Sequence, residues 1–347
     1  MTDDTKPKGR VTLRDVAREA GVSIKTVSRV VNGEPMVNPA TAERVTEVAS
    51  RLGYRPNELA RSLKGKASRT IGLIIADISN PFFADLCQAV EQVARAKGYS
   101  VVLCASAEDV EAEKEYVGIL TSRRVDGLLL VPAPHGQGYL REEQASGLPI
   151  VALDRPADGI STDVVMVENR AAARGATQHL ISYGHSNIAF IGDDENIYTA
   201  TERLAGYREA LEAAGLDAIY RLGAGRAASA QKAATELLAL PNRPTAFFAG
   251  NSLMTAGVLR AVEDANLRVP EDVAVVGFDD FELLSLLRPE LTRVRQPTQE
   301  IGRQGAELLF DRIDGKGPPE PHRLVLATEL IVRESGGRHA TPSPDTQ

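Results

Sequence analysis

Seven short apolar runs, separated by segments long enough for helices, largely determine the fold expected for residues 70–335. The runs are IGLIIAD, SVVLCAS, GLLLVPA, PIVALD, NIAFIGD, AFFAGN and VAVVGFDD. Uninterrupted apolar runs of this length are typical of parallel strands that are buried on both faces. Because they come in two successive sets, we predict a two-lobed α/β body built on two doubly wound sheets.

The N-terminal segment has a different pattern, which predicts a small all-α head. Residues 13–32 read LRDVAREAGVSIKTVSRVVN, with apolar residues at helical spacing on both sides of Gly21. Glycine adopts the positive φ of a tight turn at no steric cost, and Ala17 leaves room for two helices to approach. Ser23 is a good N-cap for the second helix. The pattern predicts a helix-turn-helix, a motif whose second helix enters the major groove of DNA.

The polar face of the predicted second helix decides between DNA recognition and an ordinary helical hairpin. The side chains on it that can bond to base edges or phosphates are Ser23, Lys25, Thr26, Ser28, Arg29 and Asn32. Ile24 points outward among them, which suits contact with a thymine methyl group. We therefore favour DNA recognition.

The charge is divided between the two ends of the chain. Residues 1–69 hold 14 Lys and Arg against 8 Asp and Glu, a net charge of +6, whereas the whole chain carries −7. The remaining residues therefore carry −13. A basic head on an acidic body is expected when one end alone meets a polyanion, although a solvated basic patch is the alternative.

A third helix and a short connector follow. Asn38 is a good N-cap, Pro39 suits the first helical position, and Gly53 ends the helix. The connector, residues 56–69, allows about two helical turns, which are marginal in water, so we expect it to fold on DNA against a second subunit. Its Leu63 could act as a wedge in the minor groove; packing of Leu59 and Leu63 against protein is the alternative.

The head and connector resemble the LacI/GalR family of bacterial repressors. The resemblance rests on VTLRDVAREAGVSIKTVSRVVNG and RLGYRPNELARSLKG and extends through nearly all of residues 11–335. It implies that Leu63 is the wedge and that Lys64 favours a central CpG step, which is easily kinked. The predicted DNA-contacting residues are Thr12, Leu13, Ser23, Ile24, Lys25, Thr26, Ser28, Arg29, Asn32, Leu63 and Lys64.

Polar residues follow the predicted strands of the body, at the ends where open α/β sheets bind ligands. The predicted effector-binding residues are Asn80, Phe82, Phe83, Asp154, Arg155, Arg203, Asn251 and Asp279. Carboxylate, guanidinium and amide groups together suit a polyhydroxylated ligand. The two phenylalanines offer a surface for a ring or, alternatively, are core residues.

The resemblance implies a similar arrangement of the body. It implies two periplasmic-binding-protein-like lobes joined by three crossovers, with the effector between them and with Arg203, Asn251 and Asp279 in contact with it. Ser252 departs from the family, because many relatives carry Asp at this position. Ser can still cap the following helix, so the departure bears on the ligand and not on the architecture.

No motif in the sequence indicates an enzyme, a cofactor or a metal site. Gly223 to Ala228 match G-x-G-x-x-A without the acidic partner of a dinucleotide site, so we predict a glycine-rich loop. The five histidines lack metal-ligand spacing, and we expect Cys87 and Cys104 to be small buried core residues. A nucleotide-dependent enzyme would need a phosphate loop. A solute-binding protein for transport would share the body, but the polar N-terminus does not resemble a secretory signal.

Together these observations predict a cytoplasmic homodimer that binds a near-palindromic operator, with no membrane span. The predicted parts are a helix-turn-helix domain (1–55), the connector (56–69), a two-lobed effector and dimerisation domain (70–338) and a disordered tail (339–347). We expect a sugar or sugar derivative as effector, with a purine corepressor as the alternative. Whether the effector induces or represses is left open.

Overall fold

The computed structural model describes residues 11–31, 36–54, 67–281, 284, 286–317 and 319–337. The chain forms two compact units, residues 1–68 and 69–347, and each is described by itself. The predicted features that lie outside the described residues are Asn32, the short helix of the connector with Leu59, the wedge Leu63, its neighbour Lys64, and the tail at 339–347. None of the described helices is both long and apolar enough to cross a membrane.

The first unit contains the three predicted helices, α1 (Leu13–Ala20), α2 (Ile24–Val31) and α3 (Pro39–Leu52). The turn before α2 begins at Gly21, whose φ of 65° is left-handed, as predicted. The side chain of Asn38 accepts a hydrogen bond from the Ala40 amide and so caps α3, which ends at Gly53. Six buried residues form the core of the head: Val16, Ala17, Ala20, Val27, Val45 and Val48. The predicted helix-turn-helix is therefore confirmed.

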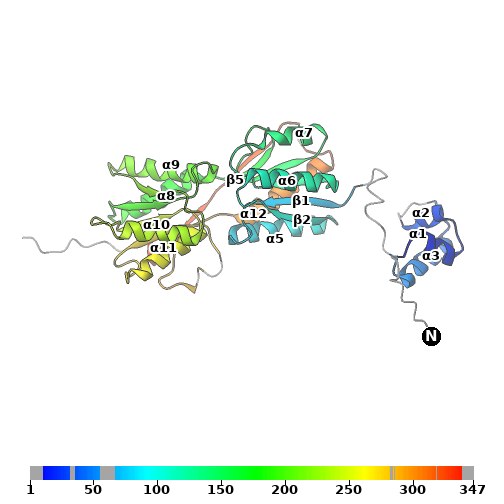
Figure 1. The fold of residues 1–347 in the computed structure, drawn as a ribbon, viewed down its shortest axis with the longest axis horizontal. Helices are drawn as coiled ribbons and strands as arrows, with labels where there is room; N and C mark the ends of the chain where they lie inside the picture. The colour runs from blue at the N-terminus through cyan, green and yellow to red at the C-terminus, as the bar shows by residue number, and fades with distance from the viewer. Residues whose placement is uncertain are drawn as a thin grey trace, which may run out of the picture. The chain divides into compact units, whose positions relative to one another are not determined.

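The second unit consists of two α/β lobes (Figure 1). The first lobe has a six-stranded parallel sheet in the order β11-β5-β4-β3-β1-β2. Its strands are β1 (Thr70–Ile75), β2 (Ser100–Ala105), β3 (Gly127–Leu130), β4 (Ile150–Asp154), β5 (Asp163–Val167) and β11 (Arg323–Leu326). Its helices are α5 (Pro81–Ala96), α6 (Val110–Ser122), α7 (Leu140–Ala145) and α12 (Thr298–Ile313).

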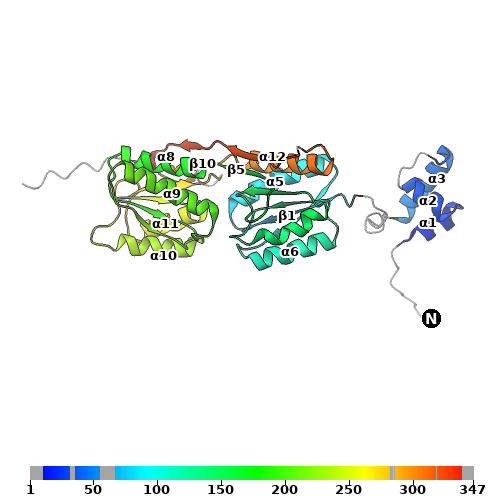
Figure 2. The same ribbon diagram turned by 90° about the horizontal axis from the view of Figure 1, so that it is seen from above.

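The second lobe repeats this order as β12-β10-β9-β8-β6-β7. Its strands are β6 (Ile188–Ile191), β7 (Ile219–Arg221), β8 (Ala246–Ala249), β9 (Ala274–Phe278), β10 (Thr292–Arg295) and β12 (Glu329–Ile331). Its helices are α8 (Asn169–Ser182), α9 (Tyr198–Ala213), α10 (Ala227–Leu238) and α11 (Ser252–Asp264). Each sheet lies between two helical layers (Figure 2): α5 and α12 oppose α6, and α8 and α9 oppose α10 and α11.

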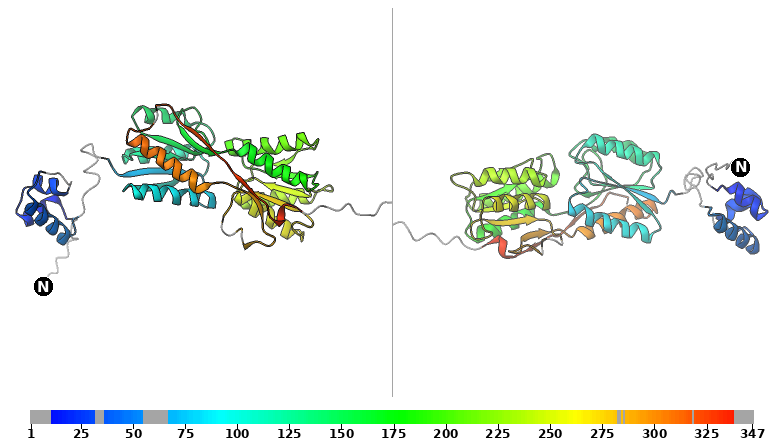
Figure 3. Two further views of the ribbon diagram at one scale, coloured as in Figure 1. Left: turned by 180° about the vertical axis from the view of Figure 1, so that it is seen from behind. Right: turned by 60° about the horizontal axis from the view of Figure 1, so that its bottom comes forward.

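Three crossovers join the lobes, as the family resemblance implies. They lead from β5 to α8, from β10 to α12, and from β11 to β12, the last of which spans two residues. The first and third crossovers lie side by side, because the Glu168 amide donates to the Leu326 carbonyl at 3.3 Å. β11 and β12 therefore form one strap that passes from the first lobe to the second (Figure 3), parallel to its neighbour in one sheet and antiparallel in the other.

All seven apolar runs form strands, but two expectations need correction. SVVLCAS is a partly exposed edge strand, because β2 has a neighbour on one side alone. Cys104 in this strand and Cys87 in α5 are therefore half-buried and not fully buried. Burial nonetheless raises the pKa of the Cys87 thiol to about 11. Five strands were not predicted: β5, β7, β10, β11 and β12.

Candidate functional site

The outer face of α2 presents the residues predicted to read DNA. Val27 is buried, whereas Ile24, in the first turn of α2, is 45% exposed and Lys25 is exposed. Ser23 Oγ accepts from the Thr26 amide at 3.1 Å, so Ser23 caps α2 as predicted. The helix thus has one face that packs on α1 and α3 and one polar face that carries the exposed Lys25, with the exposed Ile24 at the border between the two.

Thr12 and Leu13 have structural partners within the head. Thr12 and Asp15 form a capping box at the start of α1, in which the Asp15 amide donates to Thr12 Oγ1 at 3.4 Å. The Thr12 hydroxyl and the Thr12 amide donate in return to Asp15 Oδ2, at 2.7 and 3.0 Å, and these two bonds lower the pKa of Asp15. Leu13 packs against the core of the head. Contacts of these two residues with DNA stay a prediction.

A cavity of about 570 Å³ lies between the two lobes of the second unit. All eight predicted effector residues line it: Asn80, Phe82, Phe83, Asp154, Arg155, Arg203, Asn251 and Asp279. They come together because the carboxyl ends of both parallel sheets face this space. A cavity of this size fits a small organic molecule.

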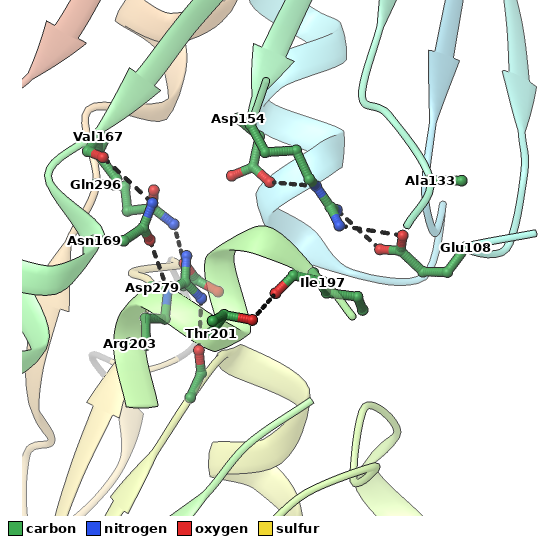
Figure 4. Close-up of polar contacts among 12 residues, drawn as sticks. Glu108, Ala133, Asp154, Val167, Asn169, Ile197, Thr201, Arg203, Asp279 and Gln296 are labelled. Carbon is green, nitrogen blue, oxygen red and sulfur yellow. Dashed lines mark hydrogen bonds and ion pairs between the residues drawn. The ribbon is translucent and has the colours of Figure 1, made fainter. Parts of the chain in front are cut away.

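On the first lobe, a buried cluster of charges surrounds Arg155. Its guanidinium donates to both carboxylate oxygens of Glu108, at 2.9 and 3.2 Å, and to Asp154 at 3.2 Å (Figure 4). Glu108 lies in a left-handed conformation with φ of 63°. Burial raises the pKa of Glu108 despite the neighbouring guanidinium. The positive charge of Arg155 is therefore already matched by two carboxylates.

On the second lobe, Arg203 is fixed on three sides. Its Nε donates to Asn169 Oδ1 at 2.8 Å and its Nη1 to the Gly250 carbonyl at 2.6 Å (Figure 4). The guanidinium also stacks on Phe278, 3.7 Å from the ring centroid. Asn169 follows the first crossover, so a cleft residue is bonded directly to a segment that joins the lobes.

Asp279 is bonded to the second crossover in the same way. Gln296 Nε2 donates to Asp279 Oδ1 at 2.5 Å, and the Ser252 amide donates to Oδ2 at 3.1 Å. Burial raises the pKa of Asp279, against the effect of nearby Arg203. Gln296 also lines the cavity, and its buried Oε1 has no hydrogen-bond partner among the residues that the structure describes.

The remaining predicted residues have a structural role in addition to their place on the cavity wall. Asn80 and Asn251 are the N-caps of α5 and α11. Phe82 and Phe83 are each 5% exposed, belong to the core of the first lobe, and contact each other edge to face at 5.1 Å. They are thus core aromatics as well as lining residues.

Sequence reasoning missed several residues of this site, including Glu108, Asp193, Gln296 and the loop at Gly225. Asp193 ends the apolar run NIAFIGD, so the rule that ligands bind at the carboxyl ends of strands could have identified it. Gly225 packs over its carboxylate, because a Cβ on Gly225 would lie 2.3 Å from Asp193 Oδ1. Gln296 follows a strand that was not predicted, so no signal indicated it.

The charge of the cavity wall is strongly acidic. Six carboxylates line it, those of Asp77, Glu108, Asp154, Asp193, Asp194 and Asp279, against three guanidinium groups, those of Arg155, Arg203 and Arg226. Burial raises the pKa of Asp193, as it does for Glu108 and Asp279, although Arg155 and Arg203 act against it. For these three carboxylates, the cost of burial therefore exceeds the stabilisation that the neighbouring arginines provide.

Comparison with known proteins agrees with the description of the helix-turn-helix head and of the two-lobed body. Residues 12–57 match the family "Bacterial regulatory proteins, lacI family", and residues 177–336 match a periplasmic binding protein-like domain. The ribose operon repressor of Halalkalibacterium halodurans is 37% identical over 95% of this chain and 98% of its own length. The transcriptional repressor PurR of Aliivibrio salmonicida is 35% identical over 93% and 98%.

The solved structures agree as well. The lac repressor dimer bound to operator and the anti-inducer ONPF is 30% identical, with a TM-score of 0.83 over 94% of this chain and 99% of that one. Identity at this level along nearly the whole of both chains is shared by proteins of one family. The protein therefore belongs to the LacI family of bacterial transcriptional regulators.

Proposed function

We propose that this protein is a repressor whose binding to operator DNA is controlled by an unphosphorylated sugar held between the two lobes. The observation that supports it most directly is the wall of the 570 Å³ cavity, where fixed carboxylate, guanidinium and amide groups converge from both lobes. Such groups can each pair with adjacent hydroxyls of a polyol. The ribose operon repressor, a relative of similar length, is named for a sugar operon.

The charge of the cavity indicates that the sugar carries no phosphate. A phosphorylated ligand would bring about two negative charges into a space where six carboxylates face three guanidinium groups. Arg155 is engaged by Glu108 and Asp154, and two of the Arg203 nitrogens are engaged by Asn169 and Gly250. Neutral hydroxyl groups can instead donate to the buried carboxylates, which lack sufficient positive partners.

A purine corepressor is the second candidate, because PurR is a relative of nearly equal identity. A flat base needs an aromatic face to stack on. Phe82 and Phe83 are buried in the core of the first lobe and contact each other edge to face, which favours the sugar.

On the DNA side, we propose a homodimer in the cytoplasm that reads a near-palindromic operator with α2 of each subunit. The exposed residues Ser23, Ile24 and Lys25 support this assignment. Other parts of the same proposal rest on the sequence. They are the wedge Leu63, the preference for a central CpG associated with Lys64, the boundaries 1–55, 56–69 and 70–338, and the tail 339–347.

The test begins by selecting the operator from genomic fragments with the purified full chain. Fluorescence anisotropy of the selected duplex is then followed during titration with D-ribose, D-glucose, D-galactose and cellobiose, their phosphates, hypoxanthine and guanine. We expect a free sugar to change operator affinity and its phosphate to have no effect. A response to the purines alone would replace the sugar proposal, and no preference for any duplex over random competitor would overturn the regulator.

A further inference from the structure

A hydrogen bond connects the two lobes directly at the cavity. Ser252 Oγ donates to Asn80 Oδ1 at 2.9 Å, although the two residues are 172 positions apart. Both are buried, with 3% and 7% of their surfaces exposed. Asn80 caps α5 of the first lobe and Ser252 begins α11 of the second, so the bond joins the starts of two helices that face each other across the cleft.

The same two residues are tied to the walls of the cavity. Asn80 Oδ1 also accepts from the Phe82 amide at 3.1 Å, and the Ser252 amide donates to Asp279 at 3.1 Å. The chain of bonds thus runs from Asp279 in the second lobe, through Ser252 and Asn80, into the first turn of α5. The bond between the lobes is therefore continuous with a carboxylate of the cavity wall.

α5 is firmly attached to the rest of the first lobe. It packs on α12, where a Cβ on Gly302 would lie 2.6 Å from the Leu86 carbonyl oxygen, so these two helices approach too closely to shift independently. Asn80 follows β1, the strand that enters the lobe directly after the connector. A displacement of Asn80 therefore moves α5 together with the rest of the first lobe.

We infer that the hydrogen bond between Ser252 and Asn80 is an interlobe latch, and that these two positioning residues set how strongly the ligand-free protein prefers the lobe arrangement seen here. Neither residue needs to contact the effector for this role. The consequence for operator control rests on the proposed function, since it requires a ligand between the lobes. The latch itself acts without any ligand.

The test therefore uses the ligand-free full chain. For each substitution, hydrogen exchange detected by mass spectrometry measures the exchange rate of peptides in the lobe that does not carry the substitution. Ser252→Ala removes the donor in the second lobe, and we expect peptides over residues 81–86 in the first lobe to exchange about three- to tenfold faster. Asn80→Ser keeps a side chain that can cap α5 but is too short to reach Ser252. We expect it to accelerate exchange over residues 252–256.

The double variant and a matched control complete the experiment. Because both substitutions remove the same bond, the double variant should exchange no faster than the faster single variant in either segment. Ser146→Ala removes a hydroxyl that bonds locally at the end of α7 and should leave both segments unchanged. Exchange that changes in the substituted lobe alone, or additive effects in the double variant, would overturn the latch. The exchange experiment contains no ligand, so its outcome does not depend on whether any sugar acts in the operator assay. The two proposals are therefore tested separately.

Discussion

Asp154 and Asp279 occupy matching positions in the two lobes and share an unusual backbone conformation. Asp154 ends β4 and Asp279 directly follows β9, and each of these strands is third from the edge formed by the strap. Their φ angles are 68° and 78°, in the left-handed region that non-glycine residues seldom adopt. Short polar side chains tolerate this region best, so aspartate suits the turn as well as the ligand.

This relationship predicts the effect of Asp279→Asn. Asparagine also tolerates a left-handed backbone, so the fold should be retained, but the charged acceptor is lost. We expect effector affinity to fall about ten- to hundredfold while operator affinity is unchanged, because a hydrogen bond to a charged group contributes about 1.5–3 kcal/mol. Titration of operator release with the active sugar measures it. A normal response would remove Asp279 from the effector site.

Gly225→Ala is expected to weaken effector binding through a different residue of the cavity wall, Asp193. The new Cβ would lie 2.3 Å from Asp193 Oδ1, so the carboxylate must move. We expect effector affinity to fall about tenfold or more, with operator binding retained. Gly118→Ala in α6 is the matched control, because a Cβ there meets nothing within 4 Å. Equal affinities in the two variants would contradict the close packing described for Gly225.

Asp193→Asn should stabilise the ligand-free protein in a manner that depends on pH. Burial raises the pKa of Asp193 in the folded chain above its ordinary value of 3.8. Ionisation of this group therefore costs folding stability at neutral pH, and the cost disappears as the pH falls through the raised pKa. We expect the variant to melt about 1–3 °C higher at pH 7.5, with the difference shrinking towards pH 4.

Thermal unfolding between pH 4 and 8 measures this difference. Asp217→Asn, which removes an exposed carboxylate that does not line the cavity, serves as the control. A difference in melting temperature that stays constant with pH, or a variant less stable than the parent at pH 7.5, would contradict the charge assigned to the cavity wall.

Lys25→Ala tests the recognition helix. Lys25 lies exposed on α2, and removal of a base-reading or phosphate-contacting side chain costs about 1–3 kcal/mol of operator binding. We expect the affinity for the selected operator to fall by that amount. Arg51→Ala, which removes a positive charge from α3 where it pairs with Glu19 at 2.8 Å, is the matched control. Anisotropy titrations at one fixed salt concentration measure both variants, and an equal loss in both would indicate a general charge effect.

The sequence was most informative where local chemistry alone determines the structure. Gly21 and Asn38 specify a turn and a cap through their own conformations and hydrogen bonds, and both predictions are confirmed. Seven strands were found because each carries a continuous apolar run, which in six of them reflects burial on both faces and in β2 does not. β7 and β11 were not predicted, because short or partly exposed edge strands carry no such run.

The predicted cavity residues came together because strand ends converge in this kind of sheet. Pairings between distant residues could not be predicted in the same way. Nothing in the sequence relates Glu108 to Arg155, or Ser252 to Asn80, because these contacts depend on how two loops or two lobes meet in space.

The strap has a consequence for how the protein is made. Residues 323–331 supply one of the two edge strands of each sheet, and they follow every other strand of the described residues. During synthesis, neither lobe can complete its sheet until this segment has left the ribosome, even though the first strand of the first lobe emerged some 250 residues earlier. Both lobes should therefore reach their native state together and late, in a single step that depends on the same nine residues.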